Sequence, residues 1–402
     1  MPPEQEPSEA SQIIRKGSGA RVEVVDYMRG VAIVSVLLLH TLLVTYHKDE
    51  LSWKGMFRSF NAEFSFLCFL PLGFGVAGVS LFFVVSGFCI HVSHQASKSW
   101  KVFFNRRFFR IYPLYLTTLI LFSFFMAPFP SRYQFLTHLF LVHNYSPNTF
   151  RTIDGPFWTL AIEVQLYLIY PALLCLCYRL GWKRTMLLLA GLEIAIRTIP
   201  WILDVAGYGH FLGYRLSWIL QFSPLGFWCS WSLGAYIAEG FLKGGTIPLS
   251  KASLYIWIPV AIGSEFFLPL FTCQFLLFSF VAAILLAKML QGSISIQLMP
   301  NVIKRLLRTS GEWSYSLYLL HYPVMVYLFS AYTALIGWCI GPEFYDKLLN
   351  PPSTNHYNVL RVGIGLLVLP VIYGISAFFY RFVERPGIAF GKKLLPKTKL
   401  TT

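Results

Sequence analysis

An arginine and a histidine stand eleven residues apart inside the first long apolar segment, which runs from Val22 to Tyr46. At about 3.6 residues per turn, this spacing places Arg29 and His40 about three turns apart on one face of a helix. A cation inside a membrane costs about 2.5–3.5 kcal/mol or more, so it normally faces a polar cavity and a partner. The pair therefore predicts a functional site. The alternative is structural, with Arg29 paired to Asp26 and His40 packed in the core.

A carboxylate lies at a matching depth in another apolar segment. Glu163 is about two turns into the segment that follows Asp154, while His40 lies in the outer half of the bilayer by the predicted topology. A carboxylate next to an imidazole orients the ring and supports its charge, as general acid–base catalysis requires. Trp158 and Tyr167 add polar tips nearby. A structural ion pair that holds the bundle together is the alternative interpretation.

Two further arginines lie at the start of the third apolar segment. Arg107 and Arg110 are three residues apart and share one helical face, whereas Arg106 turns away. Arginine guanidinium groups match phosphate oxygens in a bidentate way, so the pair predicts binding of an anionic cytosolic ligand such as a coenzyme A thioester. The alternative is that these arginines reach lipid phosphates and only fix the topology.

Other polar residues in apolar segments carry weaker predictions. His321 lies near mid-membrane, two residues before Pro323, and is interpreted as structural or supporting rather than catalytic. His91 and His94 lack a third ligand nearby, so no metal site is expected. The seven cysteines are odd in number and show no spacing typical of a disulfide framework, so they are expected to be packing residues.

The segment from residue 75 to 90 combines glycines and serines with aromatic residues. Gly75, Gly78 and Gly87 are predicted to allow close approach of neighbouring helices. Ser80 and Ser86 are predicted to hydrogen-bond across helices.

The composition excludes an ordinary soluble domain. Hydrophobic residues make up 56% and charged residues 13% of the 402 residues, and the mean hydropathy is +0.58, compared with about 45–50% apolar and about 25% charged residues in soluble domains. The net charge of +15 does not indicate nucleic-acid binding. Most of the lysines and arginines lie in loops on the side of the two termini, which is the positive-inside pattern of a membrane protein.

We therefore predict an all-α fold, a polytopic membrane bundle of about ten transmembrane helices with both termini in the cytoplasm. Residues 1–21 are predicted to be a disordered tail, 22–386 the membrane domain and 387–402 a basic cytoplasmic tail. The predicted spans are about 22–46, 72–94, 108–127, 157–178, 184–203, 215–238, 252–268, 270–290, 312–333 and 358–383.

Several motifs in this order resemble the membrane acyltransferase-3 family of multi-pass O-acyltransferases. The resemblance covers the chain from Asp26 to Pro386, and each motif alone is weak. The motifs are the Arg29/His40 helix, Ser-Leu-Phe-Phe-Val-Val-Ser-Gly-Phe at 80–88, Arg-x-x-Arg-Ile-x-Pro at 107–113, Trp-Thr-Leu-x-x-Glu-x-x-x-Tyr at 158–167, Tyr-Ser-Leu-Tyr-Leu-Leu-His at 315–321 and Glu-Arg-Pro at 384–386.

The resemblance implies a role for each of four residues. It implies that His40 is catalytic, with Arg29 supporting it, and that Arg107 and Arg110 contact acyl-CoA. Some members of the family carry a fused extracytoplasmic esterase-like domain. The sequence shows none, which predicts a stand-alone enzyme that meets its acceptor directly or passes the acyl group to a separate protein.

The predicted function is O-acylation. An acyl group, most simply acetyl from acetyl-CoA, would move from the cytosol to a hydroxyl of an extracytoplasmic acceptor, either a glycan or a lipid-linked molecule. The catalytic candidates are His40, Arg29 and Glu163, with Asp26, Trp158, Tyr167 and His321 in support. The expected location is the bacterial cytoplasmic (inner) membrane, in contact with membrane lipid. The rival hypothesis is an exporter in which Arg29, His40 and Glu163 form a proton relay.

Overall fold

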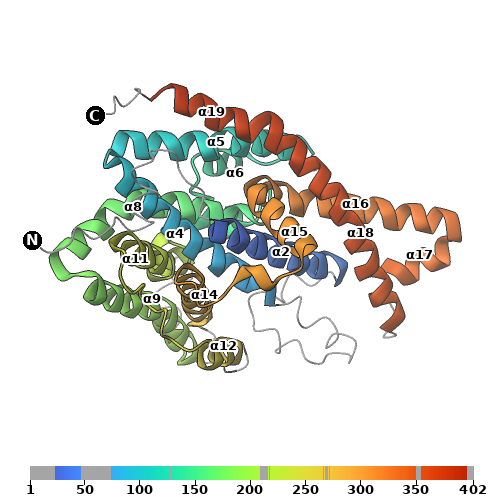
Figure 1. The fold of residues 1–402 in the computed structure, drawn as a ribbon. Helices are drawn as coiled ribbons and strands as arrows, with labels where there is room; N and C mark the ends of the chain where they lie inside the picture. The colour runs from blue at the N-terminus through green and yellow to red at the C-terminus, as the bar shows by residue number, and fades with distance from the viewer. Residues whose placement is uncertain are drawn as a thin grey trace, which may run out of the picture.

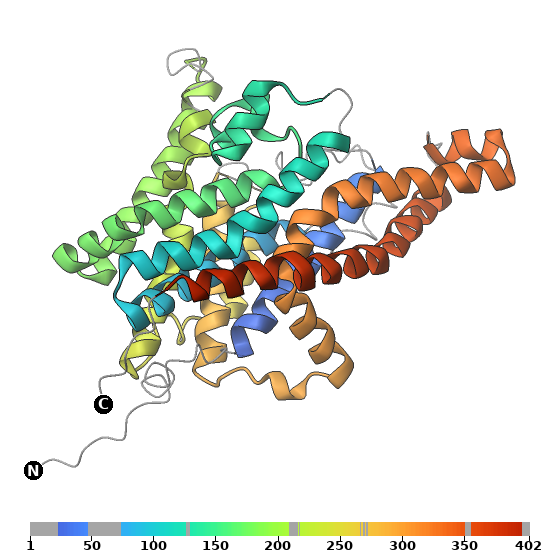
Figure 2. The same cartoon turned by 90° about the horizontal axis from the view of Figure 1, so that it is seen from above.

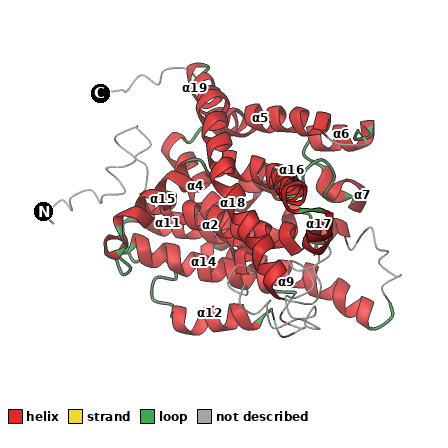
Figure 3. Ribbon diagram, turned by 90° about the vertical axis from the view of Figure 1, so that its right-hand side faces the viewer, coloured by secondary structure: helices red, strands yellow, loops and turns green. Residues whose placement is uncertain are grey.

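The chain is helical throughout the part that the structure describes, and Figure 3 shows no strand there. The structure is a computed structural model, and it confirms the predicted all-α bundle. The whole of the predicted N-terminal tail, residues 1–21, and residues 396–402 of the predicted C-terminal tail lie outside its described residues. The described residues are 23–46, 74–125, 129–208, 216, 218–265, 267, 270, 272–349 and 355–395.

Seven described helices are long and apolar enough to cross a membrane. Two shorter apolar helices accompany them, so the predicted count of about ten spans and the side of the termini stay predictions. The seven are α2 (Glu23–Tyr46), α4 (Ala77–Ser97), α5 (Trp100–Phe125), α8 (Phe157–Leu180), α9 (Trp182–Val205), α16 (Ser314–Ile340) and the stretch that runs from α18 (Asn355–Phe379) through the π-turn η6 (Tyr380–Glu384) into α19 (Arg385–Lys393).

Shorter elements join and cover these helices. They are η2 (Phe74–Val76), α6 (Arg132–Leu139), η3 (His143–Tyr145), α7 (Pro147–Phe150), η4 (Pro224–Phe227), α11 (Trp228–Lys243), α12 (Leu254–Gly263), α14 (Gln274–Leu290), η5 (Ile296–Leu298), α15 (Asn301–Glu312) and α17 (Pro342–Leu349).

Two predicted spans differ from the helices in the structure. The continuous helix in the predicted span 215–238 is α11, which begins only at Trp228 after the 3₁₀ turn that opens at Pro224. The predicted span 252–268 contains α12, which ends at Gly263. Pro224 stands at the start of this 3₁₀ turn and has no N–H to donate to the preceding turn, which favours an interruption there. A short helix followed by a turn can have the same apolar composition as one long helix, so composition alone did not reveal these shorter helices.

The predicted C-terminal boundary also falls inside packed structure. The helix α19 begins at Arg385, with Pro386 in its first turn where a proline is tolerated. Figure 1 shows α19 lying alongside α5. A Cβ added at Gly391 would lie 2.4 Å from the Cβ of Phe109, so the two helices are in close contact. Residues 387–393 therefore belong to the folded bundle and not to a free tail.

The first helix, α2, lies at the centre of the bundle, where it packs against α4, α15, α16 and α18 (Figure 1). The helix α8 packs against α9, α4 and α11. Figure 2 shows α16 and α18 running side by side and projecting from the body, with α17 joining their far ends. The site described below is formed by α2, α4, α5, α8 and α16.

Glycines allow the closest helix crossings, as the sequence predicted. A Cβ added at Gly87 of α4 would lie 2.1 Å from the carbonyl oxygen of Trp231 in α11. On the other helix, a Cβ at Gly234 would lie 1.8 Å from the carbonyl oxygen of Val84. Real Cβ atoms do not approach backbone so closely, so the α4–α11 crossing requires glycine at both positions.

We expect Gly234→Val to destabilise the protein by about 3 kcal/mol or more, because the added methyl groups would force α4 and α11 apart. The matched control is Gly363→Ala in α18, where an added Cβ meets nothing within 4 Å. The measurement is the thermal unfolding midpoint of detergent-purified protein, followed by size-exclusion chromatography. An unchanged midpoint for Gly234→Val would contradict this crossing.

Candidate active site

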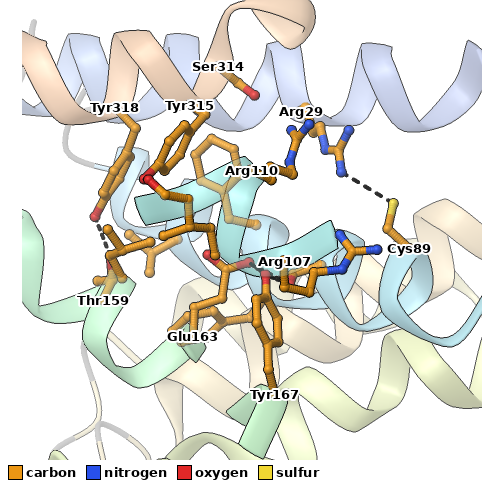
Figure 4. Close-up of a pocket in the computed structure, with 16 residues that line it drawn as sticks. Arg29, Cys89, Arg107, Arg110, Thr159, Glu163, Tyr167, Ser314, Tyr315 and Tyr318 are labelled. Carbon is orange, nitrogen blue, oxygen red and sulfur yellow. Dashed lines mark hydrogen bonds between the residues drawn. The ribbon is translucent and has the colours of Figure 1, made fainter. Parts of the chain in front are cut away.

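One pocket inside the bundle is lined by polar side chains from five helices (Figure 4). It encloses about 770 Å³ of space not occupied by protein atoms, part of it open to solvent. The polar and charged residues that matter most to its chemistry are Arg29, Arg107, Arg110, Glu163, Tyr167 and Tyr318.

Arg29 extends from α2 into this pocket. Its Nη2 donates a hydrogen bond to the Cys89 Sγ of α4 at 3.3 Å (Figure 4). Arg29 also interacts electrostatically with Asp26, the partner named in the structural alternative, and with Glu163 across the pocket. The guanidinium charge is thus partly balanced by carboxylates, as expected for a cation held inside a membrane protein.

Arg107 and Arg110 reach the same pocket from α5, while Arg106 is exposed. The Nε of Arg107 is buried and has no hydrogen-bond partner among the described residues. Glu384 interacts electrostatically with Arg110 and accepts a hydrogen bond from the Ser316 hydroxyl at 2.6 Å. A buried guanidinium N–H without a partner is costly, so the donor set of the pocket fits an anionic ligand.

Glu163 is fixed by a hydrogen-bond network that joins three helices. The Ser86 hydroxyl of α4 donates to Glu163 Oε1 at 2.6 Å, and the Tyr167 hydroxyl donates to the same oxygen. The indole of Trp231 in α11 donates to the Ser86 hydroxyl at 3.2 Å. The predicted cross-helix hydrogen bond of Ser86 is therefore confirmed, and Glu163 faces the arginine side of the pocket.

The ring partner of His40 is a second histidine. The Nε2 of His321 lies 3.0 Å from the Nδ1 of His40, and that Nδ1 also lies 3.0 Å from the Val36 carbonyl oxygen. The Tyr322 ring meets the His40 ring edge-on at 5.3 Å. The sequence predicted that Glu163 orients His40, but the contacts of Glu163 in the structure are those described above. The structure thus brings His40 to His321 instead.

Tyr318 lines the pocket and also lies next to the histidine pair. Its hydroxyl hydrogen-bonds to the Thr159 hydroxyl and donates to the Pro156 carbonyl oxygen at 3.0 Å (Figure 4). Its ring lies 5.7 Å from the ring of His321. Tyr318 therefore contacts both the cationic pocket, which it lines, and the His40–His321 pair.

Trp158, predicted as a supporting residue, takes part in an aromatic cluster. It is buried and stacks on Phe150 at 5.3 Å, with Phe222 and Phe227 at 5.8 and 5.9 Å. Its role in the structure is to anchor the start of α8, which carries Thr159 and Glu163. His91 and His94 likewise lie in a separate cluster of α4, where His91 contacts Glu239 at 2.9 Å.

A second histidine pair lies in the segment between α5 and α8. The rings of His138 and His143 stack at 3.9 Å and are fully buried. Burial lowers the pKa of His138 to about 4 and holds the pKa of His143 well below its usual range. Burial also raises the pKa of the Asp154 carboxyl well above its usual range. The two histidines are therefore neutral near pH 7, and their stacked rings pack in the segment between α5 and α8.

Several residues of the site were missed by sequence reasoning. Tyr318 and Thr159 line the pocket and hydrogen-bond to each other, and Cys89 contacts Arg29. Tyr318 stands three residues before His321 in the same motif, so helical spacing was the signal that a shared face holds both. A single cysteine in an apolar span carries no comparable signal.

A bundle of membrane-spanning helices around an internal pocket lined by three arginines and a carboxylate defines a polytopic membrane protein with a polar site at its core. The chain belongs to the acyltransferase-3 family, because residues 22–381 match that family, described as an acyltransferase domain. The protein is therefore an integral membrane acyltransferase.

The similar proteins support this assignment. The chain is 27% identical over 272 residues to the acyltransferase MdmB of Streptomyces mycarofaciens, covering 63% of this chain and 69% of that protein. It is 28% identical over 308 residues to a putative acetyltransferase, ORF330, of Acidianus two-tailed virus, covering 71% and 85%. An uncharacterized protein of Haemophilus influenzae is 31% identical over 122 residues, covering 25% and 50%. No solved structure matches the chain.

Proposed function

We propose that the protein transfers an acyl group, most simply acetyl, from cytosolic acyl-CoA to a hydroxyl of an extracytoplasmic acceptor. The observation that carries the proposal is the convergence of Arg29, Arg107 and Arg110 on one pocket. The Tyr318 ring, which lines this pocket, lies 5.7 Å from the ring of His321, the hydrogen-bond partner of His40. The viral relative is named a putative acetyltransferase, which supports acetyl as the acyl group. The bacterial inner membrane stays a prediction.

The arginines are the proposed binding site of the donor. Coenzyme A carries phosphate groups, and arginine forks bind phosphate oxygens through charge-assisted hydrogen bonds. The unpartnered Nε of Arg107 is one free donor for such a bond. Asp26 and the Glu163–Tyr167 network hold the remaining charges in place around the ligand.

His40 is the proposed general base. It takes the proton of the acceptor hydroxyl as the oxygen attacks the thioester carbonyl carbon, and the carbon–sulfur bond then breaks. The proton leaves with the coenzyme A thiolate, which gives the ester and free CoA. Tyr318 lies next to both the pocket and His321, so the thioester end of the donor would reach His40 near this side chain. Formation of an acyl-imidazole on His40 is the alternative course of the same reaction.

The acceptor class is proposed from the topology. The predicted orientation puts His40 in the outer half of the membrane, so an acceptor at the outer face reaches it without crossing the bilayer. A glycan is the preferred acceptor, and a lipid-linked molecule is the closest competitor. A separate acyl-receiving protein is a further proposed partner.

The first test measures free CoA released from acetyl-CoA by purified protein in lipid nanodiscs, with a mixed glycan and lipid extract as acceptor. We expect acceptor-dependent CoA release together with acetylated product. Movement of the acceptor across the membrane without consumption of acetyl-CoA would overturn the proposal. It would support the rival exporter, in which Arg29, His40 and Glu163 relay protons.

A further inference from the structure

The protons on the His40–His321 pair can be assigned from the atoms around each ring nitrogen. The Nδ1 of His321 lies 3.1 Å from the Leu317 carbonyl oxygen and 2.8 Å from the Tyr318 carbonyl oxygen. Carbonyl oxygens only accept hydrogen bonds, so this Nδ1 carries a proton. In a neutral imidazole, the other nitrogen then has a lone pair. The Nε2 of His321 is therefore an acceptor.

The same reasoning fixes the proton of His40. Its Nδ1 lies 3.0 Å from the Val36 carbonyl oxygen and 3.0 Å from the Nε2 of His321, and both neighbours are acceptors. The proton of His40 therefore resides on Nδ1. With His321 so assigned, a proton on His40 Nε2 would leave the His40 Nδ1 lone pair facing both the Val36 carbonyl oxygen and the His321 Nε2 lone pair. It follows that the Nε2 of His40 carries the lone pair.

His321 is well placed to hold this arrangement. Its side chain is fully buried in α16 and is fixed by backbone carbonyls of the preceding turn, so its ring cannot rotate without losing both bonds. Among the described residues, the other charged or titratable groups around His40 are the Tyr322 ring, which meets it edge-on, and Arg151, which interacts with it electrostatically.

We propose that His321 is a positioning residue that selects the Nδ1–H form of His40 and thereby makes His40 Nε2 the basic atom of acyl transfer. The proposal rests on the proposed function of His40 as general base. When Nε2 takes the acceptor proton, the Nδ1–H of His40 keeps its hydrogen bond to the His321 Nε2. His321 therefore supports the imidazolium charge while its own protons stay in place.

The kinetic test compares two variants of His321. Leucine removes the acceptor, whereas glutamine keeps a carbonyl oxygen near the position of Nε2. Because the Val36 carbonyl oxygen still accepts from His40, we expect His321→Leu to lower kcat roughly tenfold, about 1.4 kcal/mol. The KM for acetyl-CoA should stay unchanged, since the arginine pocket is intact. His321→Gln should recover most of the lost kcat, and a merely structural role would not produce this order.

The second test reads the proton positions directly and does not depend on activity. Magic-angle-spinning NMR of ¹⁵N-histidine-labelled protein in bilayers separates protonated from unprotonated ring nitrogens, and His40→Gln assigns the His40 signals by difference. We expect a protonated Nδ1 and an unprotonated Nε2 on His40 in the wild type and in His321→Gln. In His321→Leu the Nδ1–H population should fall.

Two results would overturn the proposal. One is a wild-type His40 with its proton on Nε2, and the other is a His321→Leu variant that keeps both the wild-type tautomer and the wild-type kcat. A failure of the proposed function gives a different pattern. In that case no variant releases CoA, yet the NMR spectrum still reports the tautomer of His40.

Discussion

The His40→Gln variant is expected to lose acyl transfer by a factor of about 10²–10⁴ in kcat, the usual contribution of a general base. Glutamine has a polar tip but no basic nitrogen, so it cannot take the acceptor proton. The KM for acetyl-CoA should be nearly unchanged, because Arg29, Arg107 and Arg110 line the pocket and His40 does not. The measurement is the initial rate of acetylated product formation at saturating acetyl-CoA.

A second membrane histidine provides the matched control. His91 is fully buried, and it contacts Glu239 and Tyr170 outside the candidate site. We expect His91→Gln to keep acyl transfer, with any loss confined to thermal stability. A folded His40→Gln variant with the kcat of the wild type would show that the base lies elsewhere, with Ser86 and Glu163 as the next pair to test.

The sequence predicted the fold class correctly. Composition and positive-inside charge bias depend only on which residues lie in each segment, and they identified a polytopic bundle without any knowledge of its contacts. Helical spacing correctly grouped Arg107 with Arg110 and excluded Arg106, because three residues nearly complete one turn. The break before α11 was missed, since the hydropathy of a segment does not record where a helix is interrupted.

The sequence did not predict which helices lie side by side. His40 and Glu163 were paired because their depths match, but α2 packs beside α16, and α8 packs beside α9, α4 and α11. The partner of His40 is accordingly His321, which had been interpreted as mainly structural. Depth follows from position within one helix, whereas lateral neighbours follow from the packing of all of them. Pairing across helices therefore needs the structure.

The Arg107→Gln variant is expected to raise the KM for acetyl-CoA about ten- to hundredfold with little change in kcat. One hydrogen bond to a charged group contributes about 1.5–3 kcal/mol, and the guanidinium of Arg107 offers one from a buried Nε. Arg107→Lys should be intermediate, because an ammonium keeps the charge but lacks the bidentate fork. The measurement is CoA release as a function of acetyl-CoA concentration.

A comparison of two donors separates the loss of phosphate binding from other effects of Arg107→Gln. Acetyl-pantetheine has the same thioester but lacks the phosphates of coenzyme A, so wild type and Arg107→Gln should use it equally poorly if Arg107 binds a phosphate. Arg106→Gln is the matched control, because Arg106 is the adjacent arginine on the exposed face of α5. It should keep the KM of the wild type for both donors. An equal rise in KM for acetyl-CoA and acetyl-pantetheine in Arg107→Gln would mean that Arg107 shapes the pocket rather than holding a phosphate.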